Sequence, residues 1–183
     1  MLNDSMRWLT VLLLVGCTSS SSTMRPVQPD DELLVATAAL IEFVGEPDSV
    51  GVLMLHHRLV GRTRDFPDSA AWTAAMDSFG LRRVRYPTLV ARYWTINRHP
   101  RRLRSPLQVP GWSVQLVDQS GQVGSGLETV HYVSRVGLSP SGDSAIVAVD
   151  AICGPLCGRG VLALYVRRVD GWKFTSTLQR LQY

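Results

Sequence analysis

Residues 128–183 read ETVHYVSRVGLSPSGDSAIVAVDAICGPLCGRGVLALYVRRVDGWKFTSTLQRLQY, and this stretch decides the fold. It contains four runs rich in apolar and β-branched residues, which turn signals separate: Glu128–Leu138, Ala145–Ile152, Val161–Arg168 and Trp172–Leu181. The first run alternates with the period of a strand, so that one face would carry Val130, Tyr132, Ser134, Val136 and Leu138. The last run has Trp172, Phe174 and Leu178 as its apolar set. We therefore predict a four-stranded antiparallel meander.

The connections between these runs have the chemistry of tight turns. Residues 139–143 combine Pro, Gly and Asp, and residues 169–171 end in Asp-Gly. The run from Ala145 to Ile152 is nearly all small or β-branched, which predicts a central strand, and only Asp150 interrupts it. A buried acid there could be catalytic, or it could pair with an arginine such as Arg135.

The part before the meander has helical patterns. Asp30 or Asp31 can cap a helix that Gly45 ends, with an apolar set at Leu33, Thr37, Leu40, Ile41 and Val44. A second helix is predicted over Pro67–Gly80, with Trp72, Met76 and Phe79 on its buried face. Val50–Leu59 and Val114–Val117 read as strands, whereas strand, helix and edge segment all remain open for Arg82–Asn97. The predicted fold class is α+β, with helices packed on an antiparallel sheet in a single domain over residues 30–183.

Charge is unevenly distributed along the chain. The 183 residues carry a net charge of +4, and residues 30–48 contain only acidic charges whereas residues 58–104 are strongly basic. Within the basic part lie Arg98, Arg101, Arg102 and Arg104, which could bind phosphates of lipid headgroups or lipopolysaccharide, or could simply form a solvated loop.

The N-terminus has the features of an export signal. Met6-Arg7 precede an apolar run, Trp8–Val15, that is too short to span a bilayer. The residues from Leu14 to Cys17 resemble the lipobox of bacterial lipoproteins. That resemblance implies a diacylglyceryl group on Cys17, cleavage before it and acylation of the new amino terminus. An ordinary signal peptide with a chance cysteine is the alternative.

These features predict the arrangement of the N-terminal part. Residues 1–16 would be a lipoprotein signal peptide, and residues 17–29, which are rich in Ser, would be a flexible tether. Several acyl chains anchor a protein stably. Cys17 is followed by Thr18 rather than by the Asp that retains enterobacterial lipoproteins in the inner membrane. We therefore expect a lipid-anchored protein of the cell envelope, on the periplasmic face of the outer membrane if the cell has one.

Two further cysteines, Cys153 and Cys157, form an even pair once Cys17 is acylated. An exported protein enters an oxidising compartment, so we predict a disulfide. A thiol redox pair is the alternative, with Arg159 as the nearby cation that could lower a thiol pKa. Zinc would need two more ligands, and the cysteine loop contains no histidine. The remaining group is His56 and His57 with His131. Neighbours on a strand point to opposite faces, so His56 and His57 cannot hold one ion from a regular strand and are expected to be a structural pair; no metal or other cofactor is predicted.

A resemblance extends over about 40 residues of the C-terminal part. The segments SRVGLSPSGDSAIVAV (134–149), CGPLCGRG (153–160) and DGWK (170–173) resemble a group of uncharacterised bacterial secreted proteins and lipoproteins. The resemblance implies the meander, the paired cysteines and export, and it implies no catalytic residue. The DGWK hairpin also resembles cone-shaped α+β folds of the nuclear-transport-factor type, which often host ligands.

The sequence contains no motif that defines a reaction. We therefore expect a binding or structural module, with the membrane, anionic headgroups or an envelope protein as partners; export disfavours nucleic acid. A pocket-based enzyme in a cone-shaped fold is the alternative, and a deep polar cavity around Asp150 or His131 would favour it. A thiol redox protein that uses Cys153 and Cys157 is a third hypothesis.

Overall fold

The computed structural model describes residues 28, 30–48, 51–61, 70, 71, 74, 86–118, 129–154 and 157–182. The helices are α1 (Asp31–Val44) and α3 (Pro87–Asn97). The strands are β1 (Gly51–His56), β2 (Arg58–Leu59), β3 (Arg101–Arg102), β4 (Trp112–Val117), β5 (Val130–Val133), β6 (Gly137–Leu138), β7 (Ser144–Gly154), β8 (Cys157–Arg168) and β9 (Gly171–Gln182). The predicted α+β class is confirmed.

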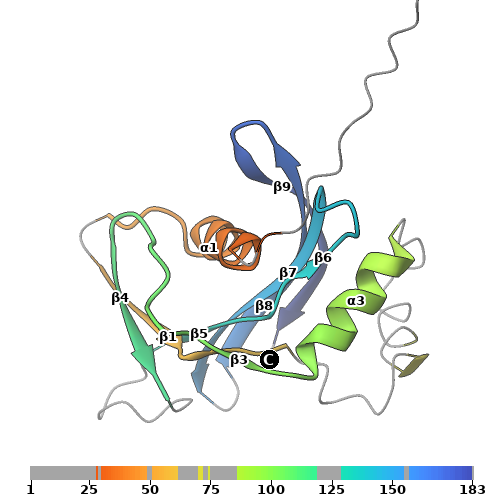
Figure 1. Ribbon diagram of the computed structural model, residues 1–183. Coiled ribbons are helices and arrows are strands. Elements are labelled where there is room, and N and C mark those ends of the chain that lie inside the picture. Colours follow the sequence, from red (N-terminus) through yellow and green to blue (C-terminus); the bar gives the residue numbers. More distant parts are fainter. Residues whose placement is uncertain are drawn as a thin grey trace, which may run out of the picture.

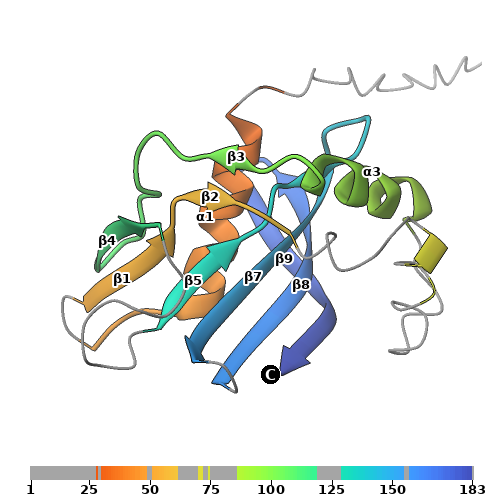
Figure 2. The same ribbon diagram turned by 90° about the horizontal axis from the view of Figure 1, so that it is seen from below.

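The large sheet has the strand order β4-β1-β5-β7-β8-β9 (Figure 2). The short strand β6 pairs with β7 on the same edge as β5 (Figure 1). Strands β7, β8 and β9 form the predicted antiparallel meander, and β5 pairs antiparallel with β7. The sheet as a whole is mixed rather than antiparallel, because β1 runs parallel to both β4 and β5. Strands β2 and β3 form a separate antiparallel ladder.

The first predicted strand is divided into β5 and β6. The hydroxyl of Ser134 accepts a hydrogen bond from the backbone N–H of Ala148 at 2.8 Å and so replaces a regular ladder contact. The backbone N–H of Arg135 donates to the Asn97 side chain at 2.8 Å, which ties the interruption to the end of α3. Gly137 permits the contact that follows, because a Cβ there would lie 2.7 Å from the Cα of Tyr93 on α3.

The two helices cover opposite faces of the meander (Figure 1). Odd-numbered residues of β7 such as Val147 pack with α1, and even-numbered residues such as Ile146 pack with α3. The pairing of β9 with β8 has two register shifts, so the apolar residues predicted for one face of the last strand lie on two different faces of the sheet. Trp172 therefore packs on the α1 side and Leu178 on the α3 side.

Helix α1 ends as predicted, since Gly45 follows it with a φ of 72°. The predicted buried face is confirmed in part: Leu40 is buried, and Leu33 and Val44 are partly buried and pack on the core, whereas Ile41 is 36% exposed. Asp30 is the N-cap residue but makes no side-chain capping bond, and the Asp31 carboxylate accepts hydrogen bonds from Gln28 and Arg167. The buried face also includes Asp31 and Glu32, which form ion pairs described below.

Other predictions before the meander have mixed outcomes. The run predicted as one strand over residues 50–59 is divided into β1 and β2, and the segment left open over residues 82–97 contains α3, with Pro87 in its first turn. The signal peptide, Cys17 and nearly all of the tether lie outside the described residues. So do the Trp72, Met76 and Phe79 side chains of the second predicted helix, within which residues 70, 71 and 74 are helical.

Candidate functional site

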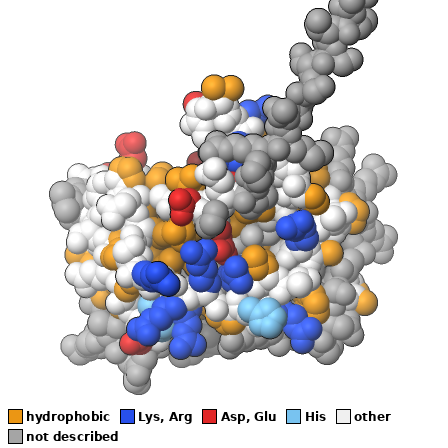
Figure 3. Space-filling model, in the orientation of Figure 1, with side chains coloured by type: hydrophobic (Ala, Val, Ile, Leu, Met, Phe, Trp, Pro, Cys, Tyr) orange, Lys and Arg blue, Asp and Glu red, His pale blue; other side chains and the backbone are white. Residues whose placement is uncertain are grey.

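Three of the four arginines singled out above lie around one hollow. Arg101, Arg102 and Arg104 line a cavity of about 1070 Å³ together with His57, Leu33, Ser105, Leu116 and Asp118. Figure 3 shows basic side chains gathered on this face of the molecule. Arg98 has a different contact, since its guanidinium lies over the Trp94 ring at 4.9 Å.

A further arginine joins this group through the β2–β3 ladder. Arg58 is the register partner of Arg102, and both side chains are exposed. Like charges directly opposite one another on a ladder repel, so an anion bound between them would relieve an unfavourable arrangement. Sequence reasoning missed Arg58 because a two-residue ladder between distant segments has no local signal. We call Arg58, Arg101, Arg102 and Arg104 the arginine face.

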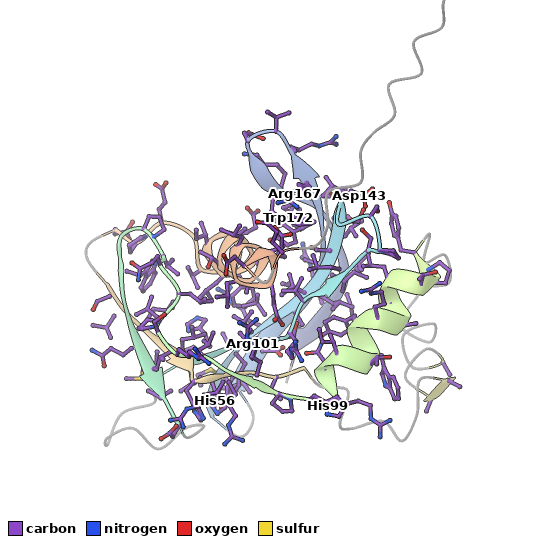
Figure 4. The ribbon with its side chains drawn as sticks, viewed as in Figure 1. His56, His99, Arg101, Asp143, Arg167 and Trp172 are labelled. Atoms are coloured by element: carbon purple, nitrogen blue, oxygen red, sulfur yellow. A yellow bond between two sulfur atoms is a disulfide. The ribbon has the colours of Figure 1, made fainter. Side chains whose placement is uncertain are left out.

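Arg101 also belongs to a buried ion cluster. It donates to Glu32 at 2.6 Å, and Arg135 donates to the same carboxylate at 3.0 Å. Figure 4 shows Arg101 between β3 and α1. Burial alone would raise the pKa of Glu32, but the hydrogen bonds from Arg135 and Arg101 outweigh it and hold that pKa below its ordinary value. Arg135 therefore pairs with Glu32, and not with Asp150 as considered above.

The chain enters the domain beside this cluster. The backbone N–H of Gln28 donates to Asp31 at 3.0 Å, and Arg167 forks onto the same carboxylate at 2.8 and 3.2 Å. Gln28 also lines a cavity of about 730 Å³ between α1, α3 and β6, to which Glu32, Arg92, His99, Arg101 and Arg135 contribute. The point of entry and the arginine face thus share Arg101.

The histidine pair is close together in space because β1 ends at His56. The two ring centroids lie 4.8 Å apart, and His56 stacks on Tyr132 at 4.9 Å. His57 lies 2.7 Å from Asp118 and accepts a hydrogen bond from Arg58 at 3.0 Å. These contacts anchor the edge of the arginine face, which agrees with the structural role expected of the pair.

The remaining candidates lie in the meander. The sulfurs of Cys153 and Cys157 lie at disulfide-bonding distance, with their Cα atoms 5.1 Å apart. Asp150 is buried opposite Gly160, whose missing side chain leaves room for the carboxylate. His131 lines a third cavity, of about 910 Å³, together with both cysteines and Arg159.

Over the described ranges, no three His, Cys, Asp or Glu side chains gather in a metal-binding group. No helix within the part of the chain that the structure describes is long and apolar enough to cross a bilayer. Comparison with family models, with curated proteins and with solved structures finds no match for this chain. The resemblance to bacterial secreted proteins and lipoproteins stays a prediction.

Proposed function

We propose that the protein is a lipid-anchored binding module of the cell envelope, whose arginine face contacts anionic headgroups. The observation that carries the proposal is that Arg101 lines both the cavity at Gln28, where the chain enters the domain, and the hollow of the arginine face. A lipid on Cys17 would hold the domain by the segment that ends at the first of these two cavities. Thr18 favours the periplasmic face of the outer membrane in a cell that has one.

The length of the tether supports this arrangement. About eleven residues separate Cys17 from Gln28, and a flexible segment of that length has a root-mean-square span of roughly 18 Å. Tethering at such a short range gives an effective concentration in the millimolar range. Contacts worth about 1 kcal/mol per arginine, which are too weak to recruit a protein from solution, therefore suffice to orient a tethered one.

The anchor is tested by the intact mass of the protein extracted from membranes. We expect the mass of a chain that begins at Cys17 and carries the diacylglyceryl group and a third acyl chain. The same sample, alkylated with and without prior reduction, should show two thiols only after reduction. An unmodified Cys17 would overturn the anchor, and thiols that react without reductant would favour redox chemistry instead.

The headgroup contact is tested on the acylated protein in vesicles. We expect amide hydrogen exchange at residues 99–105 to be slower in vesicles with phosphatidylglycerol than in vesicles of phosphatidylcholine alone. Replacing Arg58, Arg102 and Arg104 by Gln should abolish the difference.

The matched control replaces three exposed cations of the last hairpin, Arg168, Lys173 and Arg180, by Gln, which removes the same charge. This control should retain the difference between the two vesicles. Equal exchange in both lipids, or equal effects of the two triple variants, would count against the arginine face.

A further inference from the structure

The cavity around His131 has the composition of a ligand site. It lies beside the C-terminal end of α1, where Val44 is about 20 Å along the helix from Asp31, and so is distinct from the arginine face. Its volume of about 910 Å³ is in the range of small-molecule pockets. Apolar side chains form much of the wall: Val44, Val52, Met54, Trp112 and Ala151.

Arg159 supplies the cavity with a positive charge. Its guanidinium lies over the ring of Phe43 at 5.1 Å, and it forms no ion pair with a carboxylate of the described residues. A guanidinium held over an aromatic ring keeps N–H groups that can donate to an anion. Arg159 therefore has donors available for a carboxylate or phosphate.

His131 supplies an acceptor next to this charge. Its Nδ1 lies 3.3 Å from the carbonyl oxygen of Met54, and since a carbonyl can only accept, Nδ1 carries the proton and Nε2 keeps its lone pair. Burial lowers the pKa of His131, and the charge of Arg159 lowers it further, against the raising effect of the Met54 hydrogen bond. The imidazole is therefore neutral at neutral pH.

Phe43 holds the two groups together. Its ring meets the imidazole of His131 edge-on at 6.3 Å while it carries the guanidinium of Arg159 on its face. A hydrogen-bond donor for an anion and a neutral acceptor thus both contact Phe43 and line the same cavity with its apolar wall. From this arrangement we propose that the cavity binds a small amphipathic carboxylate that carries a hydroxyl next to its carboxyl group.

In this assignment the carboxylate meets Arg159, the hydroxyl donates to Nε2 of His131, and the apolar part lies along Trp112 and Val52. The site is independent of the headgroup contact, because it shares no residue with the arginine face. Neither proposal depends on the other.

Two soluble probes separate these contributions. 3-Phenyllactate has the carboxylate, the hydroxyl and an apolar ring, whereas 3-phenylpropionate lacks only the hydroxyl. Titration calorimetry on the purified protein as it is extracted from cells, with the matching buffer or lipid blank subtracted, should show that 3-phenyllactate binds several-fold more tightly.

Three variants test the assignment. Arg159→Gln should weaken both probes about tenfold or more, since it removes a charge-assisted contact, whereas the matched control Arg180→Gln should weaken neither. His131→Phe retains a ring against Phe43 but has no acceptor, so it should abolish the preference for 3-phenyllactate and leave 3-phenylpropionate unchanged. Val52→Trp alters an exposed position of the wall and should block both probes by filling the cavity.

The outcomes that overturn the proposal are equally specific. The proposal is overturned if neither probe binds the wild-type protein at millimolar concentration. It is also overturned if Arg159→Gln or Val52→Trp leaves the binding unchanged. A preference for 3-phenyllactate that survives in His131→Phe would remove His131 from the site. Melting curves of each variant show whether a loss of binding comes from unfolding. If Arg159→Gln unfolds the protein, Arg159→Lys replaces it in the test. This variant keeps the charge but cannot donate two parallel hydrogen bonds, so it should bind with intermediate affinity.

Discussion

The two ends of α1 are surrounded by arginines in opposite ways. At the N-terminal end, buried acids receive them, since Arg135 and Arg101 bind Glu32 and Arg167 binds Asp31. At the C-terminal end, Arg159 meets an aromatic ring and no described carboxylate.

This difference shows that the partner of an arginine side chain indicates its role. A guanidinium whose donors are taken by a buried acid holds elements together, and its removal should cost stability. A guanidinium that rests on a ring, or faces another arginine as Arg58 faces Arg102, is available to an external anion. These two roles are distinguished by the partner of each arginine and not by the number of arginines.

The largest expected effect is at the N-terminal end. Glu32→Gln should lower the free energy of unfolding by about 3 kcal/mol, because it leaves Arg101 and Arg135 without their buried counter-charge. Urea denaturation measures the change. The matched control is Glu42→Gln on the same helix, where the side chain is exposed and the loss should be below about 0.5 kcal/mol. Equal losses in the two variants would contradict the distinction between the ends of α1.

A smaller effect is expected beside the C-terminal end. Replacing Cys153 and Cys157 together by Ser should lower the free energy of unfolding by about 2 kcal/mol, since the short closed loop no longer restricts the unfolded chain. Reductant should destabilise the wild-type protein by a similar amount. It should have no effect on the double variant, and a further loss there would show that another reducible bond contributes.

The contribution of Glu32 should depend on pH. Its pKa is lower in the folded protein than in the unfolded chain, so the ionised form stabilises the fold above the unfolded pKa. This stability is lost as the pH falls through the folded pKa, below about pH 5. The difference in stability between the wild-type protein and Glu32→Gln should therefore shrink on acidification. A difference that stays constant from pH 7 to pH 3 would argue that Glu32 acts through packing alone.

The smallest effects on the free energy of unfolding are expected for arginines that form no ion pair with a described acidic side chain. Arg102→Gln and Arg159→Gln should each change the free energy of unfolding by less than about 0.5 kcal/mol, because neither breaks an ion pair among the described residues. Thermal or urea unfolding checks this. A loss above about 2 kcal/mol in either variant would place that arginine in the structural group with Arg135.

The sequence predicted those parts of the fold whose signals are local. Proline and glycine between Ser139 and Asp143, and Gly171 in the last turn, indicate hairpins within a few residues, so the β6–β7 and β8–β9 hairpins could be anticipated. Gly45 likewise marks the end of α1. The parallel pairing of β1 with β4 and β5 could not be anticipated, because it joins segments about sixty or more residues apart without a turn between them.

The candidate sites were anticipated only in part, for the same reason. Arg101, Arg102 and Arg104 are neighbours in the sequence and were recognised together, whereas Arg58 reaches them only through the ladder. The buried face of α1 was predicted only in part, because Asp31 and Glu32 have the character of surface residues until their arginine partners are known. His131 was named as a residue that a polar cavity could surround, but only the fold brings Arg159 near it.

The register shifts in β9 affect whether two copies of the protein can pair edge to edge at high local concentration. β9 lies at one end of the strand order, so its outer edge is free to add a strand from another molecule within the described part of the sheet. Its two register shifts disturb the regular spacing of hydrogen-bonding groups, and exposed Arg180 would repel the same edge of a second copy. Under the anchor proposed above, neighbouring copies would meet often at the membrane surface, and these features of β9 would keep such encounters from propagating into an intermolecular sheet.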